Sequence, residues 1–283
     1  MMRLRNLKEG IDETGTPDMK YYAFDWDDNI LEMPTKIILI NKEGKEVGMS
    51  TEDFADYRSE IGKHPFEYEG ETIINFAPNA FRNFTVEGDR NFLVDAMIAK
   101  PAPAWGDFVE ALNGGSIFAI ITARGHSPYI LKEACYNLII SNYEGLSSKE
   151  CIKNLEKYRD FVGETKSKGD IIREYLDMCK FYPVSYGEEG KAASPEELKN
   201  KALREFISYV KEMSVILGKK AYLKNVVTNN FVPKLGVSDD DLKNLQSYLK
   251  AFGKELKGGE GVDLKLISTR GGKKSAFKDE EKK

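Results

Sequence analysis

A short apolar segment that ends in acidic residues constrains this chain more than any other feature. Residues Tyr21–Phe24 have the length and composition of a buried strand, and Asp25, Asp27 and Asp28 follow it almost at once. Open α/β sheets hold ligands at the carboxyl ends of their buried parallel strands. Carboxylates crowded at such an edge raise one another's pKa unless a cation or a shared proton relieves the repulsion. The segment therefore predicts a metal site, an acid–base pair, or both.

Composition indicates a globular protein. The chain has 283 residues, of which 41% are hydrophobic and 31% are charged, so it can form one large domain or a core domain with a substantial insertion. No apolar run approaches the roughly 20 residues that span a bilayer, and the first residues lack the apolar stretch of a signal peptide. We therefore expect no membrane association and a cytoplasmic location. The sequence leaves the oligomeric state open.

Several residue types that build other kinds of site are scarce. The cysteines Cys135, Cys151 and Cys179 show no CxxC spacing, and their odd number argues against a disulfide framework or a structural zinc site. The histidines His64 and His126 are predicted to be structural. The net charge of −4 gives no general attraction to nucleic acid or anionic membranes, although it leaves room for a local basic groove. Any chemistry therefore rests mainly on carboxylates.

Alternating apolar and amphipathic segments predict an α/β fold, with a doubly wound (Rossmann-like) parallel sheet and helices on both faces. The predicted core strands are Tyr21–Phe24, Ser116–Ile121, Phe181–Tyr186 and Phe231–Val237. The clearest predicted helices are Pro128–Ile140 and Pro195–Met213. Ser194 and Pro195 form a strong helix start, because serine is a good N-cap and proline suits the first helical position.

The spacing of these elements predicts an interrupted core, formed by residues 20–31 and 101–255. Residues 32–100 are far more than one crossover needs, so we expect an inserted cap module after the first strand. Within it, residues 36–41 and 46–49 predict a β-hairpin. Ser50 then caps a predicted helix that ends near Ile61.

Three further segments lie outside this scheme. Residues 142–180 predict additional helices after the second core strand. Residues 1–19 predict an N-terminal arm. Residues 256–283 are rich in glycine and charge, so we expect a flexible tail that is disordered from about Thr269.

Three of the predicted strands end in polar residues that occur in a characteristic order. Asp25 and Asp27 follow the first strand, Thr122 ends the second, and Asp239 and Asp240 end the fourth. This ordered set resembles the haloacid dehalogenase superfamily of phosphohydrolases, including the phosphatases of phage and repair systems. That family has an Asp-x-Asp motif, a Thr or Ser, a Lys near a helix start and a final acid pair. The resemblance extends from about residue 20 to residue 250.

The match departs from the family pattern in two places. Asp28 and Asn29 stand where many members have Gly and then Thr or Val. The motif lysine has several matches: Lys199 and Lys201 lie early in the helix that follows Ser194, and Lys191 precedes it. We prefer Lys201, because an apolar helical run follows it as in the family.

The resemblance implies Mg²⁺-dependent hydrolysis of phosphomonoesters. Asp25 would attack phosphorus to form an aspartyl-phosphate, and Asp27 would act as general acid and then general base. The implied metal ligands are Asp25, Asp27 through its backbone carbonyl, Asp239 and Asp240. The implied phosphate-binding groups are the Trp26 backbone amide, Thr122, Ala123, Arg124 and Lys201.

The insertion lies where this family places a cap, and caps close over small substrates, so the expected substrate is a small phosphorylated molecule. A first alternative is a phosphatase for nucleic-acid ends, which a long open flap and the basic tail would favour and the acidic net charge would not. A second is a binding or structural protein that keeps the fold without turnover. A phosphomutase or phosphonatase is a further alternative, although the latter needs a cap lysine that the sequence does not identify.

Overall fold

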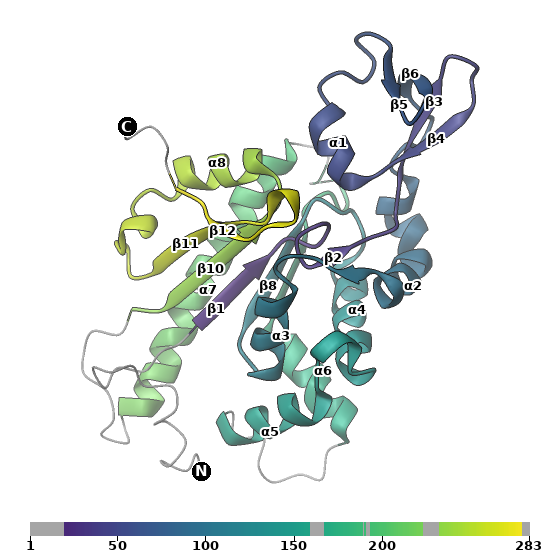
Figure 1. Ribbon diagram of the computed structural model, residues 1–283. Coiled ribbons are helices and arrows are strands. Elements are labelled where there is room, and N and C mark those ends of the chain that lie inside the picture. Colours follow the sequence, from purple (N-terminus) through teal and green to yellow (C-terminus); the bar gives the residue numbers. More distant parts are fainter. Residues whose placement is uncertain (1–19, 159–166, 189, 191–192, 223–231, 279–283) are drawn as a thin grey trace.

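The computed structural model describes residues 20–158, 167–188, 190, 193–222 and 232–278, and the predicted arm of residues 1–19 lies outside them. The described chain is an α/β protein built on a mixed six-stranded sheet with the order β12-β11-β10-β1-β8-β9 (Figure 1). Five strands are parallel to their neighbours, and β12 is antiparallel. The strands are β1 (Lys20–Phe24), β8 (Phe118–Thr122), β9 (Lys180–Pro183), β10 (Lys234–Asp239), β11 (Asp263–Ser268) and β12 (Ser275–Ala276).

All four predicted core strands are confirmed, with ends shifted by a few residues. The predicted flexible tail is wrong, because β11 and β12 lie inside it. Leu264 and Leu266 of β11 are 1% and 3% exposed, and Thr269, where disorder was expected to begin, is 1% exposed. Glycines and charges around this strand dominate the composition and conceal its alternating apolar residues.

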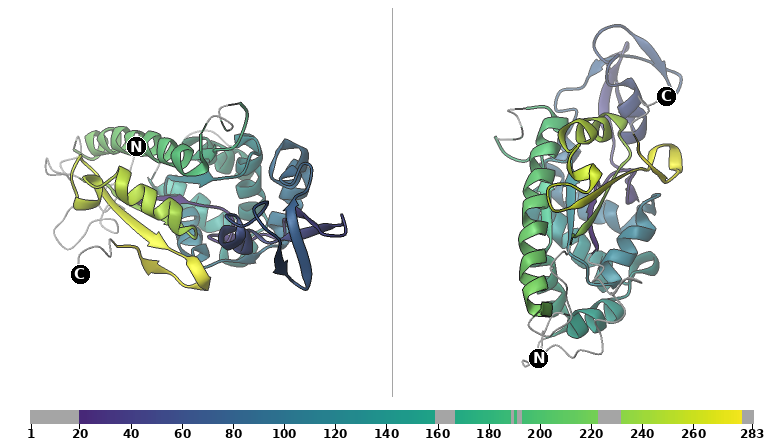
Figure 2. Two further views of the ribbon diagram at one scale, coloured as in Figure 1. Left: turned by 90° about the horizontal axis from the view of Figure 1, so that it is seen from above. Right: turned by 90° about the vertical axis from the view of Figure 1, so that its left-hand side faces the viewer.

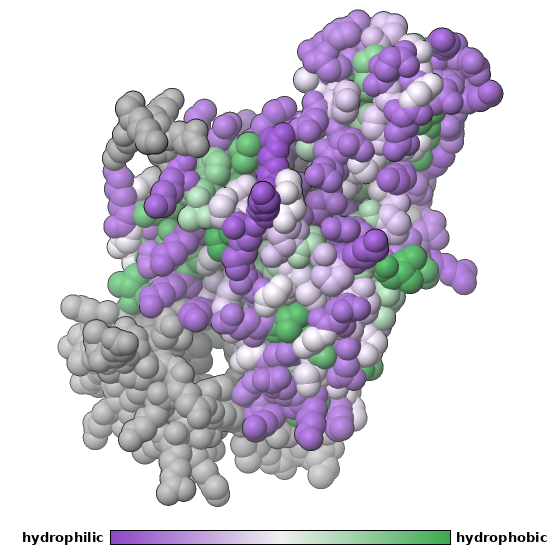
Figure 3. Space-filling model, in the orientation of Figure 1, coloured by the Kyte–Doolittle hydropathy of each residue, from purple (hydrophilic) through white to green (hydrophobic). Residues whose placement is uncertain are grey.

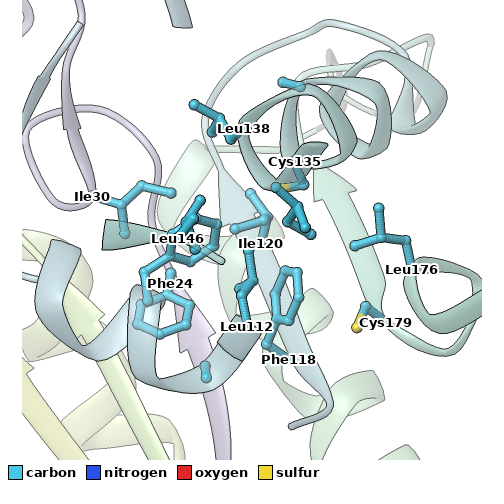
Figure 4. Close-up of a cluster of buried hydrophobic side chains, with 14 of the residues drawn as sticks. Phe24, Ile30, Leu112, Phe118, Ile120, Cys135, Leu138, Leu146, Leu176 and Cys179 are labelled. Atoms are coloured by element: carbon cyan, nitrogen blue, oxygen red, sulfur yellow. The ribbon is translucent and has the colours of Figure 1, made fainter. Parts of the chain in front are cut away.

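Helices cover both faces of the sheet, and two buried clusters lie between them and the strands. Phe24 of β1 belongs to the first cluster and Ala23 to the second, as expected for neighbours on a strand. Figure 4 shows the first cluster, with Phe24, Ile120 and Leu176 among its labelled members. The helices of the first cluster include α3 (Trp105–Asn113), α4 (Pro128–Ile140), α5 (Ser148–Tyr158) and α6 (Lys168–Met178). Those of the second are α7 (Pro195–Tyr222) and α8 (Leu242–Ala251).

The helix starts follow local capping signals. Ser127 caps α4 by accepting a hydrogen bond from the Ile130 N–H, and α4 has the predicted bounds. The helix α7 begins at Pro195 as predicted but continues past Met213, along one face of the sheet (Figure 2). The helices α5 and α6 are the additional helices expected within residues 142–180. None of the helices in the described ranges is long and apolar enough to cross a membrane.

The inserted module begins and ends at a two-stranded ribbon of β2 (Leu31–Glu32) and β7 (Lys100–Pro101). It contains a separate antiparallel sheet with the order β4-β3-β6-β5, which lies beyond the core at the upper right of Figure 1. The strands of this sheet are β3 (Ile37–Asn41), β4 (Glu46–Met49), β5 (Phe66–Tyr68) and β6 (Glu71–Phe76). The predicted hairpin is therefore confirmed. Ser50 caps α1 (Thr51–Tyr57), which ends earlier than predicted.

One helix of the insertion belongs to the core instead. The helix α2 (Asp89–Ile98) follows the small sheet, yet Phe92 and Ala96 are buried in the first core cluster. It contacts α4 on the same face of the main sheet. The second half of the insertion is therefore fixed against the core.

Candidate active site

Three carboxylates meet at the carboxyl ends of β1 and β10. Phe24 pairs with Ser238 in the parallel register, so Asp25 and Asp239 lie side by side on neighbouring strands. Oxygen atoms of Asp25, Asp239 and Asp240 lie within 4.8 Å of one another. Asp25 is 8% exposed and Asp239 is 1% exposed, so their charges are largely removed from water. Burying several carboxylates together costs free energy unless cations offset their negative charge.

A buried lysine offsets part of this charge, and it is Lys199, not the predicted Lys201. Lys199 Nζ lies 2.9 Å from Asp239 Oδ2 and 3.1 Å from Asp25 Oδ1, and its side chain is 1% exposed. Burial alone favours the neutral amine, but the charges of Asp239 and Asp25 raise the pKa of Lys199 well above its usual value. Lys201 is exposed. Two residues turn an α-helix by about 200°, so these lysines lie on opposite sides of α7.

The environment of Asp25 fits a bound divalent cation. The net pKa of Asp25 is raised from 3.8 to about 7, and burial is the largest cause. The charge of Lys199 lowers the pKa, whereas the charges of Asp239 and Asp27 raise it. Asp25 Oδ1 is buried and accepts no hydrogen bond from the described residues, although the Lys199 ammonium contacts it as an ion pair. Carboxylate oxygens are hard ligands of the kind that Mg²⁺ and Ca²⁺ prefer. Asp25, Asp239 and Asp240 could therefore hold such an ion.

A buried asparagine joins the ends of three strands at this site. Asn29 Nδ2 donates to Asp25 O and to Ser238 Oγ, at 3.0 Å in each case. Asn29 Oδ1 accepts a hydrogen bond of 2.9 Å from Thr269 Oγ1. These partners come from the carboxyl ends of β1, β10 and β11. The network fixes the backbone that carries Asp25, and its last member lies in the segment predicted to be disordered.

Asp27 lies outside the cluster of three carboxylates and is bound by Arg124. Arg124 Nε donates to Asp27 Oδ2 at 2.8 Å and Nη2 donates to Oδ1 at 2.6 Å. The guanidinium also lies over the rings of Phe84 and Phe92, with Cζ 4.6 and 4.8 Å from their centroids. Arg124 is 1% exposed. Most of the Arg124 donors are thus used inside the protein, and its contact with substrate stays a prediction.

The other predicted phosphate-binding residues differ in their accessibility. Thr122 ends β8 beside β1 and is 1% exposed, and its hydroxyl accepts a hydrogen bond of 3.3 Å from the Arg124 backbone N–H. Ala123 is exposed at the same end of the strand. The Trp26 side chain is fully buried and packs on Phe92, with ring centroids 5.2 Å apart. Its indole therefore has a packing role.

A cavity of about 600 Å³ lies beside Asp240, between the inserted module and the C-terminal part of the core. Ion pairs link α1 and its C-cap residue to the core: Arg270 Nη2 lies 2.6 Å from Asp56 Oδ1, and Arg58 Nη2 lies 3.0 Å from Asp241 Oδ2 and 3.2 Å from Glu196 Oε1. The visible surface of the inserted module is mostly hydrophilic (Figure 3). The charged lining comprises six acidic residues, Asp28, Glu32, Glu52, Asp56, Asp240 and Asp241, and two basic ones, Lys243 and Arg270.

Comparisons of the chain with protein-family models, with curated proteins and with solved structures found no match. The geometry of the site therefore carries the functional argument.

Asp28 is expected to give this site a pH-dependent stability. It has a positive φ of 54° and accepts a hydrogen bond from the Thr51 hydroxyl of α1. Burial, and then repulsion from Asp27, raises the pKa of Asp28 from 3.8 to about 7. The folded state therefore holds this proton more tightly than the unfolded state, so the contribution of Asp28 to stability falls as the pH rises from about 4 to 7.

The substitution Asp28→Asn removes the carboxyl group and therefore the loss of stability at higher pH. Asparagine also tolerates a positive φ. We expect it to raise the free energy of unfolding by about 1–2 kcal/mol at pH 8, after discounting for solvent screening, and to give no gain at pH 4. Urea unfolding in EDTA at both pH values measures the difference. The control is Glu69→Gln, an exposed turn residue that also has a positive φ. An equal effect of Asp28→Asn at both pH values would contradict this account.

Proposed function

We propose that this chain is a Mg²⁺-dependent phosphomonoester hydrolase of the haloacid dehalogenase type. The observation that carries the proposal is the buried group of Asp25, Asp239 and Asp240 beside Lys199. One ammonium does not offset three carboxylates, and a divalent cation would complete the balance. It would also remove the repulsion between Asp25 and an anionic phosphate.

The strand order supports this proposal. β1 lies inside the sheet, with β8 and β9 on one side and β10 and β11 on the other. We infer a doubly wound, Rossmann-like arrangement in which the chain winds outward from β1 in both directions. Asp25 and Asp239 would then lie at the point where the direction changes, which is where open α/β sheets bind ligands.

In the proposed reaction, an Asp25 carboxylate oxygen attacks phosphorus, the alcohol leaves, and water then hydrolyses the aspartyl-phosphate. Asp27 has to enter the reaction protonated; it gives that proton to the leaving oxygen and regains one from the attacking water. Lys199 lowers the pKa of Asp25 and attracts the non-bridging oxygens, to which Thr122 can donate its hydroxyl proton. Bound Mg²⁺, held by Asp25, Asp239 and Asp240, would supply the remaining charge neutralisation.

The charge of the cavity favours a small substrate over a nucleic-acid end. Its charged lining has six acidic and two basic residues, and one of the basic residues, Arg270, is paired with Asp56. A polyanion gains affinity by contacting several basic side chains, which this lining does not offer. A binding or structural protein without turnover remains the alternative that the next experiment decides.

The test is phosphate release from sugar phosphates, nucleotides and phosphorylated oligonucleotides, with Mg²⁺ and with EDTA. We expect the wild type to be active only with Mg²⁺, and Asp25→Asn to lower turnover at least about 10³-fold because it removes the nucleophile. The matched control is Asp177→Asn, since Asp177 is exposed and forms a surface ion pair with Lys132. The control should keep full activity.

Thermal unfolding provides a readout besides activity. Mg²⁺ should raise the melting temperature of the wild type and of Asp177→Asn, because it binds only the folded state, and should have a smaller effect on Asp25→Asn. A folded wild type that binds Mg²⁺ and releases no phosphate from any substrate would favour the role without turnover. Activity that persists in EDTA or in Asp25→Asn would overturn the proposal.

A further inference from the structure

The inserted segment reaches Asp27 through the side chains that surround Arg124. Besides its two hydrogen bonds to Asp27, Arg124 donates from Nη2 to Thr35 Oγ1 at 3.1 Å, and its Nη1 lies 3.1 Å from His126 Nε2. Its guanidinium is also enclosed by Phe84 and Phe92. The orientation of Arg124, and with it that of the Asp27 carboxylate, therefore depends on a defined set of neighbours.

The tautomer of His126 follows from these contacts. Arginine only donates hydrogen bonds, so His126 Nε2 must accept from Arg124. The proton of the neutral ring is then on Nδ1, which lies 2.8 Å from Asp89 Oδ1 and donates to it. Burial, and then the charge of Arg124, lowers the pKa of His126, which favours this neutral form. His126 also stacks on Phe92, with ring centroids 4.5 Å apart.

The groups that hold Arg124 come largely from the insertion. Thr35, Phe84, Asp89 and Phe92 all lie between β2 and β7, the two strands that bound the insertion. The backbone is tied at the same place, since Gly125 N donates to Phe84 O at 2.7 Å. A side chain at Gly125 would come within 2.9 Å of the Ser185 carbonyl oxygen, so this close approach requires glycine.

We propose that Asp89 and His126 are positioning residues, which fix Arg124 and through it the Asp27 carboxylate. The inserted segment would then take part in the proton-transfer step. The proposal rests on the proposed function, in which Asp27 protonates the leaving oxygen while the phosphorus–oxygen bond breaks. A general acid is effective only when it is aimed at the atom that receives the proton. Loss of Asp89 or His126 should leave Asp27 present but poorly oriented.

Two substrates with different leaving groups distinguish a positioning role from a general loss of activity caused by a damaged fold. An alkyl phosphate needs a proton on its leaving oxygen, whereas the p-nitrophenolate ion leaves without one. We would measure alcohol release in the first turnover with Mg²⁺, so that only the first half of the reaction counts. Asp89→Asn and His126→Gln should slow the alkyl phosphate about 10- to 100-fold and p-nitrophenyl phosphate less than about 3-fold.

The matched control is Glu87→Gln, which makes the same kind of charge change at an exposed residue two positions from Asp89. It should leave both substrates unaffected. Asp89 is 26% exposed in its side chain, so Asp89→Asn should preserve the fold. Equal slowing of both substrates, or no slowing, would overturn the positioning role and leave the proposed function intact. A wild type that releases neither alcohol would overturn both.

Nitrogen-15 NMR tests the geometry without activity. The chain has two histidines, and His64 is 61% exposed in its side chain, so its ring provides an internal reference. We expect His126 to show the neutral tautomer with its proton on Nδ1, because Arg124 can only donate to Nε2. A proton found on Nε2 in the wild type would contradict the arrangement.

Discussion

A chain that ends at Val262 is expected not to fold, although composition alone suggests that the residues beyond it are a tail. The truncation removes β11, whose six residues all pair with β10. It also removes Leu264 and Leu266, which are buried against α8 and its neighbours in the second cluster. Loss of a buried leucine typically costs about 2–5 kcal/mol, so together with the strand pairing the loss approaches the whole stability of a typical domain.

A chain that ends at Thr269 is the matched comparison. It retains β11 and the hydrogen bond from Thr269 to Asn29, and it loses the short strand β12, the ion pair between Arg270 and Asp56, and Phe277 at the edge of the second cluster. We expect this chain to show helical circular dichroism and a cooperative urea transition, and the shorter chain to show no such transition. A cooperative transition of wild-type midpoint in the chain ending at Val262 would mean that β11 is dispensable.

Lys199→Met is expected to lower the free energy of unfolding by about 3–5 kcal/mol in EDTA, the usual range when one partner of a buried ion pair is removed. The reason is that Asp25 and Asp239 would both remain buried without their ammonium. Lys201→Met provides the control, since it makes the same change two residues away at an exposed position. Urea unfolding of both variants measures the difference.

The same variants also test the proposed cation site. Mg²⁺ should restore part of the stability of Lys199→Met, because a bound cation replaces some of the missing positive charge. Activity should fall strongly in Lys199→Met and stay near that of the wild type in Lys201→Met. Equal destabilisation by the two substitutions would contradict the assignment of the buried lysine.

The sequence predicted the elements whose signals are local. The structure contains three such elements: the strand before Asp25, the helix α7 that begins at a proline, and the hairpin of β3 and β4. Each is marked in the sequence by a local pattern of apolar residues, a turn or a cap. Such patterns depend on neighbouring residues only. The parallel register then places Asp25 next to Asp239, because strands that share a direction end at the same edge of a sheet.

Two errors of prediction had usable signals in the sequence. Lys199 precedes Ala202 and Leu203 by three and four residues, so helical periodicity puts it on the same face as these buried residues. The preference for Lys201 rests on the apolar helical run that follows it and does not consider which face of the helix the lysine occupies. In β11 the alternation of Leu264 and Leu266 with polar neighbours was outweighed by the glycines and charges around it.

The pairing of Arg124 with Asp27 could not have been predicted. Arg124 follows Thr122 closely, so its position suggested contact with phosphate. Its partners Asp27 and Thr35 are 97 and 89 positions away in the chain. No periodicity or composition links residues at such separations, and only the folded arrangement brings them together.

The hydrogen bond between Asn29 and Thr269 joins residues that are 240 positions apart. At about 5–20 residues per second, a ribosome needs roughly 10–50 s to make the chain between them. For most of that interval β10 is not yet made, so the nascent chain carries Asp25 without Asp239 and Asp240. The three carboxylates can therefore meet only after β10 has been made, and a chain that lacks β10 would present no such cation site.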